Sequence, residues 1–84
     1  MDRRKEPRIP SKGEVTLLTD DQIHIRGNIQ DVSVGGLSVD AEVEIAPGTQ
    51  VRIDCHDFYA TGIVRHCGAC GSAFRLGVEL RPPD

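Results

Sequence analysis

Two short segments of this 84-residue chain carry side chains that could bind an anionic ligand. The first holds an arginine pair, Arg4 and Arg8, with the spacing R-x-x-x-R. The second reads D-x-S-x-x-G from Asp31 through Ser33 to Gly36. An arginine side chain presents a planar fork that fits phosphate oxygens or the O6 and N7 acceptors of guanine. The arginine pair therefore predicts a contact with phosphate, with guanine, or with both.

The second segment offers complementary groups on one side of the chain. Asp31 and Ser33 are two residues apart, so in an extended strand they point the same way. Gly36 has no side chain, so the backbone there can turn sharply or lie close to a ligand. A carboxylate is an acceptor that complements the donor edge of guanine. The two segments together suit a ligand with guanine bases and phosphates, although Asp31 and Ser33 could also serve an ordinary turn.

Most of the chain alternates apolar and polar residues with period two, which is typical of strands with one buried and one wet face. A further strand is expected over 58–66, with Ala60, Gly62 and Val64 inward. The other inward sets are Val15 and Leu17; Ile23, Ile25 and Ile29; Leu37 and Val39; Val51, Ile53 and Cys55; and Phe74, Leu76, Val78 and Leu80.

Turn signals separate these strands. They are Asp20-Asp21, Gly35-Gly36, Pro47-Gly48 and the stretch 67–71, which is expected to be a hairpin loop. Residues 41–46 fit either a strand or a short turn of helix. Six short strands with tight connections predict an all-β fold, an antiparallel β-barrel or sandwich, and closing a barrel would remove exposed sheet edges.

Charge is distributed unevenly along the chain, whose formal net charge is −3. Residues 1–12 hold five basic residues against two acidic ones, whereas residues 13–84 hold five against eleven. Pro7 blocks a regular helix in the first segment. We therefore expect a flexible basic arm over 1–12, attached to an acidic barrel over 13–84, that attracts a compact anion better than a nucleic-acid polymer.

Compartment and membrane association can be judged from composition. No apolar run is long enough for a membrane-spanning helix, and no apolar stretch follows the N-terminal charges as in a secretory signal. An odd number of cysteines, three, fits a reducing compartment better than a disulfide framework. The expectation is a cytoplasmic protein without membrane contact.

The cysteines and histidines allow rival interpretations. Cys67 and Cys70 have C-x-x-C spacing and His66 adjoins them, so a zinc site or a redox pair is conceivable beside a purely structural role. A strong zinc signal would need a second such pair, and Cys55-His56 are adjacent. No nucleophile has a base at a persuasive spacing, so we expect no enzyme, no metal and no cofactor.

Taken together, the motifs make the chain resemble the PilZ domain family. The resemblance covers essentially the whole chain and includes the two motifs, Gly35-Gly36-Leu37-Ser38-Val39, Pro47-Gly48 and the closing Leu76-Gly77-Val78-Glu79-Leu80. It implies a six-stranded antiparallel β-barrel that acts as a receptor for the bacterial second messenger cyclic di-GMP. Many members add a helix after the last strand, whereas this chain ends at Arg81-Pro82-Pro83-Asp84.

The resemblance also implies a site. Arg4 and Arg8 would grip guanine and phosphate, Asp31 would accept hydrogen bonds from guanine, and Ser33 would support the ligand. Gly35 and Gly36 would allow close approach. Arg3, just before the arginine pair, looks compatible with a stacked ligand pair. Ordering of the arm would be read by a protein partner or a fused output domain.

Two other functions compete with that of a receptor. The chain could be a protein-interaction module with this fold that binds no nucleotide, but here both motifs are complete. It could also be a small RNA- or DNA-binding barrel. Such barrels usually display aromatic stacking residues, whereas this chain has only Phe58, Tyr59 and Phe74, of which Phe74 is expected to be buried.

Overall fold

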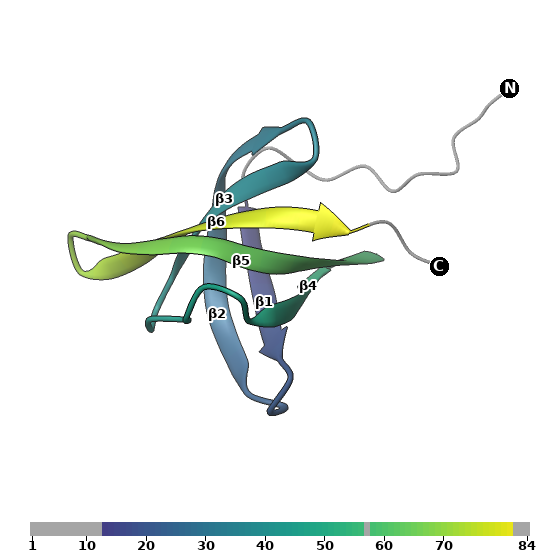
Figure 1. The fold of residues 1–84 in the computed structure, drawn as a ribbon, viewed down its shortest axis with the longest axis horizontal. Coiled ribbons are helices and arrows are strands. Elements are labelled where there is room, and N and C mark those ends of the chain that lie inside the picture. The colour runs from purple at the N-terminus through teal and green to yellow at the C-terminus, as the bar shows by residue number, and fades with distance from the viewer. Residues whose placement is uncertain (1–12, 57, 82–84) are drawn as a thin grey trace, which may run out of the picture.

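A computed structural model describes residues 13–56 and 58–81, and these form six antiparallel strands without a helix (Figure 1). The prediction of a small all-β barrel is confirmed. No helix among the described residues is long and apolar enough to cross a membrane. The strands are β1 (Gly13–Thr19), β2 (His24–Ser33), β3 (Gly36–Ala41), β4 (Gln50–Cys55), β5 (Phe58–Cys70) and β6 (Ala73–Arg81).

The strands close into a barrel in the order β1-β2-β3-β6-β5-β4. Pairing of β1 with β4, in which Leu17 lies opposite Ile53, completes the ring. β2, β3, β6 and β5 are consecutive in this order, so they present one continuous outer surface. The hairpin of β5 and β6 extends past the other strands (Figure 1).

The core lies inside the barrel and is entirely apolar among the described residues. Its largest fully buried side chains are Leu17, Ile29, Val39, Val64 and Leu76, which come from five different strands. These residues occupy the inward phase of the alternating pattern, so the sequence pattern and the burial agree. A core of this kind fixes which side chains of each strand face outward.

Two expectations near the strand ends were wrong. Ile23, expected to be inward, precedes β2 and is 52% exposed. In the segment 41–46, Ala41 ends β3, and residues 42–46 are irregular rather than strand or helix. Ile45 nevertheless packs into the core from this loop, while Val43 remains 46% exposed. The loop supplies one core residue without adding a strand.

The hairpin expected at 67–71 is present, but most of its predicted loop is strand. β5 continues to Cys70, which pairs with Ala73, so the turn is made by Gly71 and Ser72. Cys67 packs against the core. Because Cys67 and Cys70 are three residues apart in a strand, their side chains point to opposite faces.

Two β-bulges interrupt the regular pairing. On β2 the register passes from Ile29 to Asp31, and on β5 it passes from Val64 to His66. Gln30 and Arg65 are thus the extra residues. A bulge places two consecutive residues opposite one and re-aims the side chains beside it. Both residues of each pair, Gln30 with Asp31 and Arg65 with His66, are exposed.

Candidate functional site

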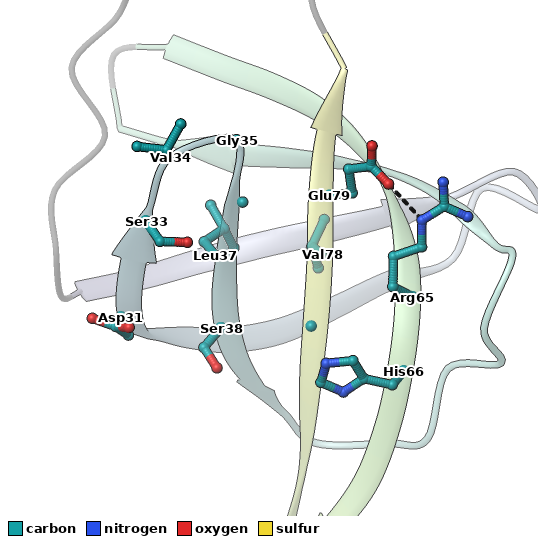
Figure 2. A pocket seen from close by; sticks show the side chains of 12 residues that line it. Asp31, Ser33, Val34, Gly35, Leu37, Ser38, Arg65, His66, Val78 and Glu79 are labelled. Atoms are coloured by element: carbon teal, nitrogen blue, oxygen red, sulfur yellow. Dashed lines mark hydrogen bonds and ion pairs between the residues drawn. The ribbon is translucent and has the colours of Figure 1, made fainter.

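An open depression of about 330 Å³ lies on the outer surface of β2, β3, β6 and β5, beside the turn between β2 and β3 (Figure 2). Side chains from all four strands border it. Its lining residues are Asp31, Ser33, Val34, Gly35, Gly36, Leu37, Ser38, Arg65, His66, Gly77, Val78 and Glu79. It is the place on the described surface where the second sequence motif meets polar groups from the far half of the chain.

The strand register arranges these residues in a cross-strand row. Asp31 pairs with Ser38, Ser38 with Gly77, and Gly77 with His66. We call these four residues the ligand row. Neighbouring strands lie about 4.8 Å apart, so the row spans roughly 14 Å from Asp31 to His66. It presents a carboxylate at one end, a hydroxyl beside it and an imidazole at the other end.

A bulge explains why Asp31 faces this surface. Ile25, Gly27 and Ile29 point inward, so strict alternation would turn Asp31 into the core. The extra residue Gln30 shifts the phase, and Asp31 and Ser33 are both exposed on the outer face. The expectation that these two side chains share a side is met, and the bulge decides which side it is.

The two glycines of the turn are favoured at their positions for different local reasons. Gly35 has a φ of 78°, in the left-handed region that favours glycine. Gly36 pairs with Glu79, and a Cβ at Gly36 would lie 2.8 Å from the Val78 carbonyl oxygen. The close approach that the sequence predicted at Gly36 is therefore, first of all, an approach of β3 to the backbone of β6.

Charges in the described part of the depression largely offset one another. The Nε of Arg65 donates a hydrogen bond to Oε1 of Glu79 at 2.6 Å, and both side chains are about half exposed (Figure 2). Asp31 adds a second carboxylate. The depression is therefore not cationic by itself, and an anionic ligand would need further positive charge.

A second ion pair lies next to the ligand row. Arg75 on β6 donates to both carboxylate oxygens of Asp40 on β3, from Nε at 2.6 Å and from Nη2 at 3.0 Å. These hydrogen bonds from Arg75 lower the pKa of Asp40 below its ordinary value. The pair joins β3 to β6 just beyond Ser38 and Gly77, and so supports the floor of the depression.

Predicted site residues fall into two groups. Asp31, Ser33, Gly35 and Gly36 are brought together at the depression. Arg3, Arg4 and Arg8, with the rest of the expected arm over 1–12, lie outside the described residues. The described chain begins at Gly13, which pairs with Ile29, two residues before Asp31.

The position of Gly13 sets an upper limit on the distance between Gly13 and Arg8. Arg8 is five residues before Gly13, so it can reach up to about 17 Å from that point. This reach is similar to the length of the ligand row. Gly13 lies on β1, next to the strand that carries Asp31, so the Asp31 end of the row is the end nearest to this point.

Sequence reasoning missed the contributions of the distant strands. Ser38, Gly77 and Glu79 belong to the segments that carry the family resemblance, but no role in the site was predicted for them. His66 was considered only as a zinc ligand. Arg65 was not singled out. The signal that could have found Arg65 and His66 is two consecutive polar residues directly after Ile63-Val64, which breaks period two as a bulge does.

The metal alternative gains no support from the described residues. Across 13–56 and 58–81, no group of three or more histidine, cysteine, aspartate or glutamate side chains could hold a metal ion. Cys55, Cys67 and Cys70 are all free thiols, and Cys55 is buried. A structural role accounts for Cys55 and Cys67, which pack in or against the core.

Comparison with known proteins and families identifies the family of this chain. No curated protein and no solved structure matches the chain. The sequence model of the PilZ domain matches residues 2–84, which is nearly the whole length. The matched span includes both sequence motifs and all six strands of the barrel. The chain therefore belongs to the PilZ domain family.

Proposed function

We propose that this protein is a non-catalytic receptor for cyclic di-GMP, with the ligand bound over the depression. PilZ domains are a cyclic di-GMP-binding family, although some members bind no nucleotide. The observation that carries the proposal is the convergence of Asp31 and Ser33 with Ser38 on the same outer face, beside the attachment point of an arginine-rich segment. Each group has a counterpart on a cyclic dinucleotide.

The charge of each residue decides which part of the ligand it contacts. Asp31 accepts hydrogen bonds from the N–H donors of a guanine, and the two serine hydroxyls satisfy sugar or phosphate oxygens. The described lining holds one arginine against two carboxylates and supplies no net positive charge, so Arg4 and Arg8 neutralise the phosphates. Arg3 adds a third cation. Gly35 and Gly36 keep the rim of the turn free of bulky side chains.

Signal transmission follows from where the ligand sits. A ligand that touches both the barrel and residues 1–12 ties that segment to one position, and such ordering is a recognised switch. A protein partner or a fused output domain, in a bacterial cytoplasm, would read the new position. The domain itself needs no catalytic group for this role.

Calorimetric titration with cyclic di-GMP tests the proposal. Each arginine contact, if charge-assisted and desolvated, contributes about 1.5–3 kcal/mol. Arg8→Ala should therefore weaken binding roughly 10- to 150-fold. Asp31→Ala should also weaken it. Arg26→Ala, an exposed arginine on β2 five residues before Asp31, is the matched control and should bind like the parent.

Three results would count against the proposal. Absence of heat from the parent protein at about 100 μM ligand would reject the receptor function. Equal affinity of Arg8→Ala, Asp31→Ala and the parent would reject the site. A bound state that forms equally well with an unrelated mononucleotide would show that the guanine contacts are not specific.

One observation favours a second candidate, a protein-interaction module that binds no nucleotide. Val34 is fully exposed at the tip of the β2–β3 turn. A partner that covers Val34 would remove its apolar surface from water, which favours association. The two functions are compatible if Val34 contacts a partner only after the ligand binds. Val34→Ala should weaken such a contact without adding a negative charge to the depression.

A further inference from the structure

His66 is held at the far end of the ligand row by the β5 bulge. The ladder matches Val64 with Val78 and His66 with Gly77, so Arg65 is the inserted residue. Without the insertion, the residue after an outward Arg65 would point into the barrel. The bulge instead exposes His66 on the outer face, and Cys67 resumes the inward phase. Bulges of this kind are common next to functional sites because they re-aim one side chain.

The imidazole ring of His66 packs directly against Gly77. A Cβ at Gly77 would lie 2.6 Å from Cε1 and 2.9 Å from Cδ2 of His66, and Nε2 would also be in contact. Three atoms of the ring thus cluster over the glycine. Figure 2 shows the ring reaching from β5 across β6. Any other residue at position 77 would push the ring off this surface.

Among the described residues that line the depression, His66 alone carries an aromatic ring. Tyrosine and phenylalanine together supply three residues of the whole chain and tryptophan none, and none of these is among the described lining residues. His66 is exposed and does line it. One side of the ring covers Gly77, so the remaining side is available to a ligand. A flat exposed ring is a surface on which a nucleobase can stack.

We propose that His66 is the residue against which one base of the bound nucleotide stacks, and that Gly77 positions its ring. This inference rests on the proposed function, because the cyclic dinucleotide supplies the base. It gives the site two ends: Asp31 reads the hydrogen-bonding edge of a purine, and His66 covers the face of a purine. The row separates the two groups by three strand spacings, so they need not act on the same base.

Affinity measurements with four variants test the stacking contact. Loss of one base–ring stack should weaken cyclic di-GMP binding roughly 5- to 150-fold in His66→Ala. His66→Phe keeps a ring and should retain affinity within about threefold of the parent. Gly77→Ala should resemble His66→Ala, because the new methyl group displaces the ring. His56→Ala, another exposed histidine, should bind like the parent.

A spectroscopic readout separates contact from mere structural support. In the parent protein, addition of cyclic di-GMP should move the ring-proton resonances of His66 upfield, because a stacked purine shields protons above its face. The rings of His24 and His56 should be unaffected. Retention of the parent circular dichroism spectrum by His66→Ala and His66→Phe keeps the affinity comparison interpretable even if Gly77→Ala fails to fold.

The outcomes separate this inference from the proposed function. Parent-like affinity of His66→Ala, together with weakened Arg8→Ala, would overturn the stacking role and leave the receptor function standing. Equal loss in His66→Ala and His66→Phe would overturn stacking in favour of an imidazole hydrogen bond. Absence of cyclic di-GMP binding by the parent protein would overturn both.

Discussion

Asp31 and His66 stand at opposite ends of one cross-strand row, and each directly follows the extra residue of a β-bulge. The two bulges lie on β2 and β5, which the barrel order separates by β3 and β6. Each bulge exposes a polar side chain at a position where alternation would bury it. A β-bulge therefore exposes the polar side chain at each end of the depression. The two strands between them, β3 and β6, pair regularly.

The carboxylate of Asp31 should be needed for binding and not for folding. Asp31→Asn keeps the shape but replaces one acceptor by an N–H₂ donor, which opposes the donor edge of guanine. We expect affinity for cyclic di-GMP to fall about tenfold or more. The melting temperature should stay close to that of the parent, because the side chain is exposed. Titration calorimetry and thermal denaturation of one preparation check both; a large fall in melting temperature would contradict this assignment.

The two turn glycines should differ in what their replacement disturbs. Gly36→Ala places a methyl group 2.8 Å from the Val78 carbonyl oxygen, so β3 and β6 must separate. We expect a loss of about 1–3 kcal/mol in the free energy of unfolding. Gly35→Ala meets no atom but strains the backbone at a φ of 78°, for a loss of about 1–2 kcal/mol.

Gly68 is the matched control for both glycine variants. A Cβ there meets nothing within 4 Å, and its φ is not positive. Gly68→Ala should be neutral or stabilise the fold by about 0.5 kcal/mol. Urea denaturation of the three variants measures the differences. If Gly36→Ala were as stable as Gly68→Ala, the close approach of β3 to β6 would not constrain this position.

The loop between β3 and β4 should contribute to stability through one side chain. Ile45 is 5% exposed and Val43 is 46% exposed, although they are two residues apart in the same irregular segment. Ile45→Ala should cost about 2–4 kcal/mol of unfolding free energy. Val43→Ala should change it by no more than about 0.5 kcal/mol. Similar losses in both variants, measured by urea denaturation, would mean that the loop is held by its backbone rather than by Ile45.

The sequence predicts most of this barrel because apolar and polar residues alternate along its regular strands. The inward set Val51, Ile53 and Cys55 was predicted as β4 has it, since these residues alternate with polar ones without interruption. Ile45 could not be assigned, because a loop residue that enters the core has no periodic neighbours. Ile23 kept the phase of β2 but preceded the strand.

The site is less predictable for a related physical reason. Asp31 and Ser33 are close in sequence, so their shared side followed from the strand period alone. His66, Gly77 and Glu79 join them only through the pairing of β3 with β6 and of β6 with β5. Such pairing depends on the closed barrel, and the bulge at Arg65 reverses the phase that a sequence pattern would assign. The stretch 67–71, with Gly68 and Gly71, added a loop signal just beyond that bulge, but only Gly71 lies in the turn.

The ion pair of Asp40 and Arg75 should make stability depend on acid. Hydrogen bonds from Arg75 lower the folded-state pKa of Asp40, so the pair contributes fully above the ordinary aspartate pKa of 3.8. Its contribution is lost as pH falls through the lowered folded-state pKa. The melting temperature of Asp40→Asn should lie below that of the parent at pH 7, and the difference should shrink toward pH 2. Asp20→Asn, in the exposed β1–β2 turn, is the control; a difference that stays constant with pH would contradict the prediction.

Arg65 and Glu79 should affect ligand affinity in opposite directions, although they form one ion pair. Removing either side chain breaks the same exposed hydrogen bond, so both variants should lose no more than about 1 kcal/mol of stability. Glu79→Ala, however, frees the Arg65 guanidinium and removes a negative charge from the depression that the anionic ligand would cover, so cyclic di-GMP should bind several-fold more tightly. Arg65→Ala leaves the carboxylate unopposed and should bind more weakly. Both shifts should diminish as added salt screens the charges. Affinities that change in the same direction, in proportion to lost stability, would show that the pair serves only to join β5 to β6.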